Sequence, residues 1–343
     1  MNEDSSSAPA VADLPPDAVM LQMLTGFQVS QAVYVVAKLD IATILAEKGP
    51  REISQLAAEA GADAGALGRV IRFLASLGVF RTNGDTVEVT ELGALLAAGP
   101  ASHQYPAIYW MEMHYAPFTD LLHTVRTGEA AAARYYGKPY FDWITEDPER
   151  TEIQNRAFAA VTSSLRDGMF DGYRLPGGTV VADIGGADGA ILARLLADDP
   201  GRAGIVFDRP EVVAAAPATI AGHGLADRVQ TVGGDFFDSV PTADVYVLSW
   251  ILHDWDDESC RTILGNIAKM ARPGARLVVV ESIMPAGDEP HLTRVADLTM
   301  LATLSGRERT EDGYRTLLDS AGFTVDRVVP TPTPFAFIES TLR

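Results

Sequence analysis

The chain has 343 residues, 47% of them hydrophobic and 21% charged, which is enough for two globular domains with a sizeable core. Its 46 acidic residues outnumber 27 Lys and Arg, and the net charge of -19 disfavours nucleic acid and anionic membrane surfaces as partners. A single cysteine, Cys260, excludes an intrachain disulfide and fits a reducing, cytoplasmic location. Cys and His pairs at zinc-ligand spacing are absent from the sequence, so no metal is expected. No uninterrupted apolar stretch reaches about 18 residues, so no membrane span is expected.

The N-terminal part of the chain predicts a disordered lead-in followed by a helical domain. Residues 1–17 are polar and contain proline, and they lack the basic-then-apolar order of a signal peptide. Met20 to Ala46 is apolar with helical periodicity, and a helix, a Gly turn, a second helix and a hairpin turning at Asn83-Gly84 follow. We assign residues 18–100 to this domain.

This order of elements resembles a winged helix, a motif used for DNA binding or for packing and dimerisation. DNA binding needs a basic surface, but the second helix offers only Arg69 and Arg72 in an acidic chain. We therefore favour a winged-helix dimerisation domain over a DNA-binding one.

Residues 101–175 are predicted to be helical and are rich in aromatic residues and methionine. Such a stripe usually packs into a core, but it could instead wall a pocket for a flat apolar ligand. We predict a helical linker that carries part of a substrate pocket. The pocket candidates, two of which lie later in the chain, are Tyr109, Trp110, Met113, Phe158, Met300 and Leu304.

Residues 176–343 alternate apolar strands with helices, which predicts a doubly wound α/β domain with a mostly parallel sheet. In such sheets, ligands bind at the carboxyl ends of the strands. The strands are expected at residues 179–186, 203–208, 229–237, 243–250, 275–283, 323–330 and 334–341. The helices are expected at residues 190–199, 211–222, 257–271 and 311–320.

A glycine-rich turn follows the first of these strands, with Gly185, Gly186 and Gly189 in "ADIGGADGA". Glycines at this place allow a ligand to approach the backbone closely. The spacing does not fit G-x-G-x-x-G, so a dinucleotide pyrophosphate site loses its main support.

Acidic residues follow at the ends of the next two strands and predict an adenosine site. Asp208 is placed to accept both ribose hydroxyls, Asp235 to accept an exocyclic amine, and Phe236 to stack on a base. Singly, each acid could cap a helix and Phe236 could be core. Together they describe adenosine without a phosphate cradle, which S-adenosylmethionine fits, and an acid such as Asp183 tolerates its cationic sulfonium.

The motifs "VADIGGADG", "FDRPEV", "LSWILHDWDDE", "VVVESIMP" and "GRERTEDGY" resemble, in this order, those of the S-adenosylmethionine-dependent small-molecule O-methyltransferases. That family includes plant caffeate and hydroxyindole enzymes and a bacterial antibiotic-tailoring branch. The resemblance covers essentially the whole chain, the N-terminal part matching the family's dimerisation domain. It implies a Rossmann-like methyltransferase domain, a homodimer, and methylation of a hydroxyl, expected to be phenolic, on an aromatic small molecule in bacterial secondary metabolism.

The resemblance also implies site residues. His253 falls on the family's general base, and Glu281 and Glu308 fall on the two acids that orient it. His253 could otherwise cap the helix at 257–271 or satisfy a turn. The implied cofactor-binding set is Asp183, Gly185, Gly186, Gly189, Asp208, Arg209, Asp235, Phe236, Ser249 and Trp250.

A base is needed because a phenol has a pKa of about 10, so that roughly one molecule in a thousand is ionised at pH 7. A histidine with a pKa of about 6.5 is mostly neutral at that pH and can accept the proton as the oxygen attacks. A carboxylate on its other nitrogen would fix the tautomer and stabilise the imidazolium.

The chain departs from the family at two positions. Ala187 stands where the glycine-rich turn usually has glycine, which puts cofactor affinity or the shape of the turn in question. Ser249 stands where plant members have a lysine directed toward the adenine.

Two alternative functions stay open. The bacterial branch contains proteins that retain S-adenosylmethionine but hydroxylate, decarboxylate or steer a pericyclic step. A DNA-binding regulator built on the winged helix is the other alternative.

Overall fold

The structure, a computed structural model, describes residues 15–99, 101–165 and 168–343. It forms two compact units, one up to Glu112 and one from Met113 onward, which divide inside the predicted segment 101–175. Most of the predicted lead-in lies outside the described residues. Its last residues do not, because the first helix begins at Pro16.

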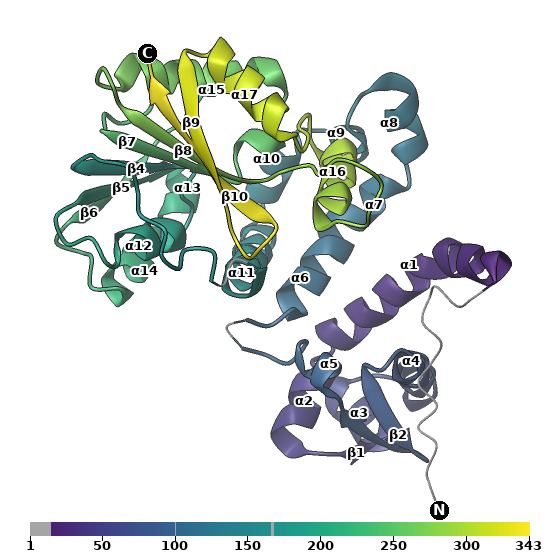
Figure 1. Ribbon diagram of the computed structural model, residues 1–343. Helices are drawn as coiled ribbons and strands as arrows, with labels where there is room; N and C mark the ends of the chain where they lie inside the picture. The colour runs from purple at the N-terminus through teal and green to yellow at the C-terminus, as the bar shows by residue number, and fades with distance from the viewer. Residues whose placement is uncertain (1–14, 100, 166–167) are drawn as a thin grey trace, which may run out of the picture. The chain divides into compact units, whose positions relative to one another are not determined.

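The first unit is a helical domain with a small sheet (Figure 1). α1 (Pro16–Lys38) and α2 (Ile41–Lys48) replace the continuous helical stretch expected from Met20 to Ala46, because Asp40 adopts a left-handed conformation (φ 55°) between them. The other elements are α3 (Ile53–Ala60), α4 (Ala64–Ser76), α5 (Glu91–Ala94), α6 (Gln104–Tyr109), β1 (Arg51–Glu52), β2 (Phe80–Asn83) and β3 (Thr86–Val89).

Local sequence explains how α4 begins and how the hairpin turns. The Asp63 carboxylate accepts a hydrogen bond from the Ala66 amide at 2.8 Å and caps α4. Asn83 pairs with Thr86 across β2 and β3, so Gly84 (φ 60°) lies in the turn. The predicted order of helix, turn, helix and hairpin is confirmed, whereas the winged-helix designation stays a prediction.

Among the described residues, α1 is long and apolar enough to cross a membrane by length and composition alone. The criterion of an uninterrupted apolar stretch missed it because polar side chains are spread along the helix. Many of its large apolar side chains are exposed in the single chain: Met20, Leu21, Met23, Leu24 and Phe27. A face of this kind needs an apolar cover.

The second unit begins with the helices predicted for residues 101–175. After a π-helical turn, η2 (Trp110–His114), these are α7 (Tyr115–Phe118), α8 (Leu121–Thr127), α9 (Ala131–Tyr136), α10 (Tyr140–Thr145) and α11 (Pro148–Leu165). Tyr136 stacks on Trp143 with ring centroids 3.6 Å apart. His114 Nε2 lies 2.8 Å from the Tyr140 hydroxyl, and burial lowers the pKa of His114 to about 3. This histidine is therefore neutral at physiological pH.

A seven-stranded sheet forms the centre of the second unit, in the order β6-β5-β4-β7-β8-β10-β9. Its strands are β4 (Val180–Ile184), β5 (Ala203–Asp208), β6 (Val229–Gly233), β7 (Val245–Ser249), β8 (Arg276–Ser282), β9 (Phe323–Pro330) and β10 (Phe335–Leu342). The pairs from β6 to β8 are parallel, and β10 is antiparallel to both β8 and β9. This confirms the predicted mostly parallel sheet.

Helices cover both faces of the sheet, as Figure 1 shows for α15 and α17 on one side and α12 and α14 on the other. The helices on the sheet are α12 (Ala190–Leu196), α13 (Pro210–Val213), α14 (Ala216–Gly222), α15 (Asp257–Met270) and α17 (Glu311–Ser320), while α16 (Leu292–Thr303) packs against α7, α8 and α9. Alternate residues of β7 enter the two cores: Tyr246 and Leu248 pack with α15 and α17, and Val245 and Val247 with α12 and α14. α16 was not predicted, and the expected helix 211–222 is split in two.

The connections reverse direction at β4, which lies between β5 and β7. Loops after these neighbouring strands therefore diverge and leave a crevice at the carboxyl edge, the usual ligand site of such sheets. The glycine turn follows β4, Asp208 ends β5, and His253 lies shortly after β7. The topology brings the predicted cofactor and catalytic residues to one edge.

Candidate active site

His253 lies on a short 3₁₀ helix, η3 (Leu252–Asp254), between β7 and α15. The chain turns sharply after β7 because Trp250 has a left-handed backbone (φ 57°), a conformation that is costly for a bulky residue. Asp256 then begins α15 by accepting a hydrogen bond from the Ser259 amide at 2.8 Å. The buried imidazole is thus presented on a rigid turn.

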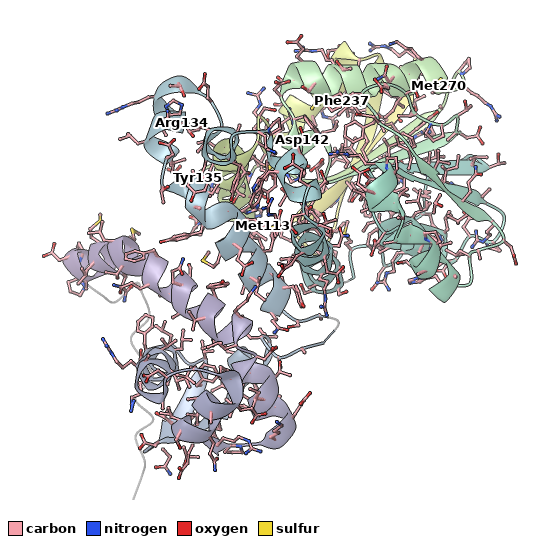
Figure 2. All side chains as sticks on the ribbon, turned by 180° about the vertical axis from the view of Figure 1, so that it is seen from behind. Met113, Arg134, Tyr135, Asp142, Phe237 and Met270 are labelled. Atoms are coloured by element: carbon pink, nitrogen blue, oxygen red, sulfur yellow. The ribbon has the colours of Figure 1, made fainter. Side chains whose placement is uncertain are left out.

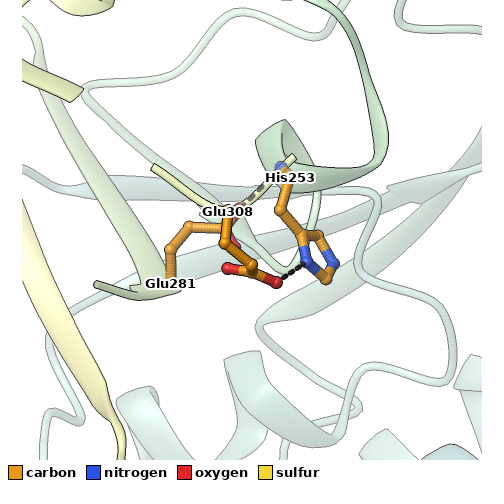
Figure 3. A group of neighbouring side chains, drawn as sticks. All are labelled: His253, Glu281 and Glu308. Carbon is orange, nitrogen blue, oxygen red and sulfur yellow. Dashed lines mark hydrogen bonds and ion pairs between the residues drawn. The ribbon is translucent and has the colours of Figure 1, made fainter. Parts of the chain in front are cut away.

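Glu308 contacts the ring of this histidine directly. His253 Nδ1 lies 2.7 Å from Glu308 Oε1, and both side chains are buried (Figure 3). A carboxylate can only accept, so Nδ1 carries the hydrogen and Nε2 is left for another partner. On that side, Asp254 Oδ1 lies 3.4 Å from Nε2.

Glu281 acts on the backbone of the turn rather than on the ring. Its Oε1 accepts hydrogen bonds from the amides of Ile251 (3.1 Å), Leu252 (2.9 Å) and His253 (3.4 Å). Figure 3 shows this contact reaching the main chain of His253 while Glu308 faces its ring. Of the two acids that the family resemblance assigns to orienting His253, the structure places Glu308 against the ring and Glu281 against the backbone amides of the turn.

The electrostatics of the cluster favour a cationic imidazole. Burial alone would lower the pKa of His253, but the negative charges of Asp254, Glu281 and Glu308 outweigh it and raise that pKa to about 10. Burial raises the pKa of Glu281 to about 7 and that of Asp254 to about 6, and in both the charge of His253 opposes the rise. A positive charge on His253 is therefore well compensated.

Potential ligand atoms of His253, Glu281 and Glu308 lie within 4.8 Å of one another, and the residue types would suit a divalent cation. However, Oε1 of Glu281 receives three amides, and the two oxygens of Glu308 receive the imidazole and the Ser282 hydroxyl. These hydrogen bonds engage Oε1 of Glu281 and both oxygens of Glu308.

The segment that carries Glu308 also contacts the backbone of the turn around His253, and these contacts were not predicted from the sequence. Buried Arg309 donates to the carbonyl oxygens of Leu252 (2.7 Å) and Trp255 (2.9 Å). A Cβ at Gly306 would collide with the carbonyl oxygen of His253, so only glycine allows this approach. Adjacency to Glu308 in "GRERT" was the only available signal.

The glycine-rich turn after β4 is closely packed against neighbouring side chains. Gly185 and Gly189 have positive φ angles of 75° and 77°, and a Cβ at Gly185 would run into the Ile251 side chain. A Cβ at Gly186 would lie 2.9 Å from the carboxylate of buried Asp183. Ala187 has φ 46°, which explains in physical terms why glycine suits this position.

Asp208 is tied to the same turn. Its Oδ2 accepts the Ala187 amide at 2.9 Å and its Oδ1 accepts the Arg209 amide at 2.7 Å. Burial raises its pKa, while these amides oppose the rise. The guanidinium of Arg209 instead pairs with Glu211 (2.8 Å) and Asp142 (3.6 Å). The turn and Asp208 form one unit, whereas the Arg209 side chain is directed to other acids.

Phe236 and Asp235 follow β6 as expected. Asp235 is exposed and accepts the Phe237 amide at 2.8 Å. The Phe236 ring is half-buried and lies edge-to-face against Trp255, with centroids 6.0 Å apart. Asn266 on α15, which sequence reasoning missed, donates to the carbonyls of both phenylalanines at 3.0 and 2.7 Å. Ser249, at the end of β7, is half-buried near the same edge.

The substrate-pocket candidates divide between the two units. Tyr109 and Trp110 belong to the first unit, where their rings contact each other at 6.3 Å. In the second unit, Phe158 lies edge-to-face on Trp250 at 6.1 Å, and Trp250 stacks on His253 at 5.7 Å. Phe158 is therefore linked to the imidazole through one aromatic ring.

Met113, Met300 and Leu304 belong to the helices of the second unit. Met113 is enclosed, with 1% of its surface exposed, while Arg134 and Tyr135 project from α9 into solvent (Figure 2). Met300 is buried on α16, which packs against α7 and α9, and Leu304 follows at the end of that helix.

A family model for the O-methyltransferase domain matches residues 118–324, and one for the O-methyltransferase dimerisation domain matches residues 21–99. The chain belongs to the O-methyltransferase family. Phenazine O-methyltransferase PhzM of Lysobacter antibioticus is 40% identical over 95% of this chain and 96% of its own. Mitomycin biosynthesis 6-O-methyltransferase of Streptomyces lavendulae is 35% identical over 90% of this chain and 89% of its own.

Solved structures agree. The crystal structure of LaPhzM superposes with a TM-score of 0.91 at 40% identity, over 96% of this chain and 100% of that one. NcsB1 from neocarzinostatin biosynthesis, in complex with S-adenosylmethionine and 2-hydroxy-5-methyl naphthoic acid, gives 0.82 at 30% identity, over 94% and 98%. One relative is named for another reaction: aclacinomycin 10-hydroxylase RdmB of Streptomyces purpurascens is 32% identical over 94% and 89%.

These matches confirm the predicted methyltransferase fold, the S-adenosylmethionine cofactor, and O-methyl transfer of the kind found in bacterial secondary metabolism. The dimerisation match favours the predicted role of the N-terminal domain over DNA binding. The residues present fit the cofactor. The backbone of the turn at Gly185–Gly189 lies too close to its neighbours to carry larger side chains, and a hollow of about 210 Å³, which Asp188 of this turn lines, opens between α11 and helices α13 and α14.

Proposed function

We propose that His253 is the general base of the methyl transfer and that Glu308 holds its ring for this purpose. The observation that supports it is the buried 2.7 Å contact between His253 Nδ1 and Glu308 Oε1. A carboxylate on Nδ1 leaves Nε2 to accept a proton and stabilises the imidazolium that forms. General-base catalysis of this kind contributes about 10²- to 10⁴-fold in rate.

The step itself uses four groups of the chain. S-adenosylmethionine, when bound, supplies the electrophilic methyl group on its sulfonium. Nε2 of His253 would take the hydroxyl proton as the acceptor oxygen receives the methyl group. The charges of Glu308 and Asp254 stabilise the resulting cation. Glu281 keeps the backbone of the turn in place through its three amide contacts.

The raised pKa of His253 determines which proton state reacts. With a pKa of about 10, the imidazole is cationic at neutral pH. If the acceptor binds with a neutral hydroxyl, the complex carries two protons on the oxygen and Nε2 and must lose one before reaction. If the acceptor binds with an ionised hydroxyl, the imidazolium already supplies the single proton of the complex. Both routes lead to the same complex, with one proton between the acceptor oxygen and Nε2. The rate therefore rises with pH as the complex with one proton replaces the complex with two.

We propose a flat aromatic acceptor with a phenolic hydroxyl. Support comes from the phenazine and mitomycin enzymes among the relatives and from the naphthoic acid bound to NcsB1. In the second unit, Phe158 and Trp250 supply flat apolar surface beside His253, and Met113, Met300 and Leu304 would complete the wall. Tyr109 and Trp110 belong to the first unit and are not part of this proposed wall.

Several residues at the carboxyl edge of the sheet are candidates to hold S-adenosylmethionine. We propose that Asp208 accepts the ribose hydroxyls, that Asp235 and Phe236 contact the adenine, and that the turn from Gly185 to Gly189 faces the methionine end. The remaining members of the predicted set are Asp183, Ser249, Trp250 and the backbone of Arg209. The Arg209 guanidinium is left out because it pairs with Asp142 and Glu211.

We further propose a cytoplasmic homodimer in which a second copy covers α1. The exposed apolar face of that helix and the dimerisation match over residues 21–99 support it. Light scattering of the purified protein tests the assembly, and a monomer at micromolar concentration would contradict it.

Product mass distinguishes this function from its alternative. The relative named as a hydroxylase makes hydroxylation by the same fold a second candidate. The protein is incubated with labelled S-adenosylmethionine and a panel of hydroxylated phenazines, quinones and naphthoates. We expect a product heavier by one CH₂ unit that carries the label. A product heavier by one oxygen and free of label would replace methyl transfer with hydroxylation.

A further inference from the structure

The second carboxylate oxygen of Glu308 is hydrogen-bonded to Ser282, a residue that has no role in the proposed function. Its Oε1 contacts His253, and its Oε2 accepts a hydrogen bond from the Ser282 hydroxyl at 2.7 Å. Ser282 is the last residue of β8 and is buried, as is the Glu308 side chain. The serine therefore reaches the imidazole through one intervening carboxylate.

Glu308 is also held by its backbone. Its amide donates to Asp297 Oδ1 on α16 at 2.9 Å. The backbone contact fixes where the residue lies, but it leaves the side-chain torsions free. Orientation of the carboxylate plane toward Nδ1 is set by the two contacts at its ends, those with His253 and Ser282.

A buried carboxylate depends strongly on its donors. Hydrogen bonds to an ionised oxygen are short and about twice as strong as neutral ones, and a buried anion that loses its donor retains its full desolvation cost. In the part of the chain that the structure describes, the Ser282 hydroxyl is the side-chain donor to Oε2. Its loss would weaken the negative charge that Glu308 presents to His253 or let the carboxylate turn away.

We propose that Ser282 is a positioning residue for His253 and acts through Glu308. The hydroxyl keeps the Glu308 carboxylate in the plane of the imidazole, so that Nδ1 stays bonded and Nε2 stays directed at the acceptor. The proposal rests on the proposed function of His253 as the base. It extends the site by one residue, adjacent in sequence to Glu281 but serving the other acid.

The charged and titratable groups around the imidazole also affect the titration of His253. Asp254, Glu281 and Glu308 face His253, Tyr314 faces the two glutamates, and Arg309 faces Tyr314. Replacing Ser282 changes none of these residues. A shift in the titration of His253 would therefore report a change in how Glu308 acts on it.

Ser340 provides a matched control. It is a buried serine on β10, next to β8, and its hydroxyl donates to the Leu277 carbonyl at 3.3 Å. Ser340→Ala removes the same atom from the same sheet without touching Glu308. Ser282→Thr retains the hydroxyl, and Ser282→Cys retains the volume with a weaker donor, which keeps the test valid if Ser282→Ala does not fold.

The first experiment follows the histidine by NMR in protein labelled with ¹⁵N-histidine, and it needs no acceptor. His253→Gln assigns the signal. In the wild type we expect a strongly deshielded Nδ1 proton. In Ser282→Ala we expect this proton to move upfield and the titration of His253 to move about one pH unit lower. Cys should be intermediate, and Thr and Ser340→Ala should match the wild type.

The second experiment measures methyl transfer to an acceptor from the panel. Ser282→Ala should lower the limiting kcat reached at high pH about tenfold, with the affinity for S-adenosylmethionine unchanged in calorimetry. A wild-type kcat and a wild-type His253 signal in Ser282→Ala would overturn the proposal. If instead His253→Ala remains fully active, the proposed base fails, while the NMR result still decides whether Ser282 acts on the histidine.

Discussion

Replacing each glutamate of the cluster by glutamine should separate the two roles that the structure gives them. In Glu308→Gln, the amide oxygen can still accept from His253 Nδ1, and the Ser282 hydroxyl can turn to accept from the new amide group. In Glu281→Gln, the oxygen can still accept the three amides of the turn. The amide group then takes the place of Oε2, which is buried and has no hydrogen-bond partner.

The magnitudes differ accordingly. A hydrogen bond to a charged group contributes about 1.5–3 kcal/mol, so Glu308→Gln should lower the limiting kcat reached at high pH roughly 10- to 150-fold. The same loss should lower the pKa of His253 from about 10 by about one to two units. Two unpaired buried N–H donors in Glu281→Gln should instead cost about 1–3 kcal/mol of folding free energy.

The assay pairs methyl-transfer rates with urea unfolding of both variants. We expect Glu308→Gln to be slow but stable, and Glu281→Gln to be clearly less stable with the smaller loss of rate. Equal stability and full activity in Glu308→Gln would refute the assignment of Glu308 to the ring. A Glu281→Gln variant as stable as the wild type would refute its role beneath the turn.

Three other substitutions test single features. Ala187→Gly should raise stability by about 0.5–1 kcal/mol in urea unfolding, because glycine accepts the positive φ without strain; a loss of stability would contradict this. Gly306→Ala should lower both stability and kcat, because its Cβ would strike the His253 carbonyl oxygen, and wild-type kinetics would argue against the close approach. Between pH of about 6.5 and about 3, His114 takes up a proton in the unfolded state but stays neutral in the folded state, where it is buried. The free energy of unfolding should therefore fall by about 1.4 kcal/mol for each pH unit as the pH is lowered through this range. His114→Gln, which can keep the contact to Tyr140, should flatten that acid slope, and an unchanged slope would exclude this group as the cause.

Sequence patterns predicted the strands and the edge at which the candidate site lies. Buried strands are visible as short apolar runs, and their alternation with helices indicates a parallel sheet with its ligand site at the carboxyl edge. Each of the first strands is an apolar run that ends in glycine or an acid, and Asp208 is indeed the last residue of β5. The helix expected at 311–320 has those bounds in α17. α16 was missed because its apolar residues are not confined to one face, and Leu292, Val295 and Leu298 are exposed.

The details of the catalytic cluster could not be predicted in the same way. Strand alternation says which face of β8 a residue occupies, but it does not say that Glu281 reaches backbone amides while Glu308 reaches the ring. Likewise, Ser282 and Arg309 are ordinary residues in sequence. Their roles arise from contacts between segments far apart in the chain, which only coordinates reveal.

The most direct test of the central claim is the pH dependence of methyl transfer by the wild type and by His253→Ala, with cofactor binding measured in parallel by calorimetry. We expect the wild-type rate to rise with pH toward the His253 pKa of about 10, and we expect His253→Ala to lose about 10²- to 10⁴-fold while binding S-adenosylmethionine normally. Undiminished turnover in His253→Ala, with intact cofactor binding, would contradict the assignment of His253 as the base.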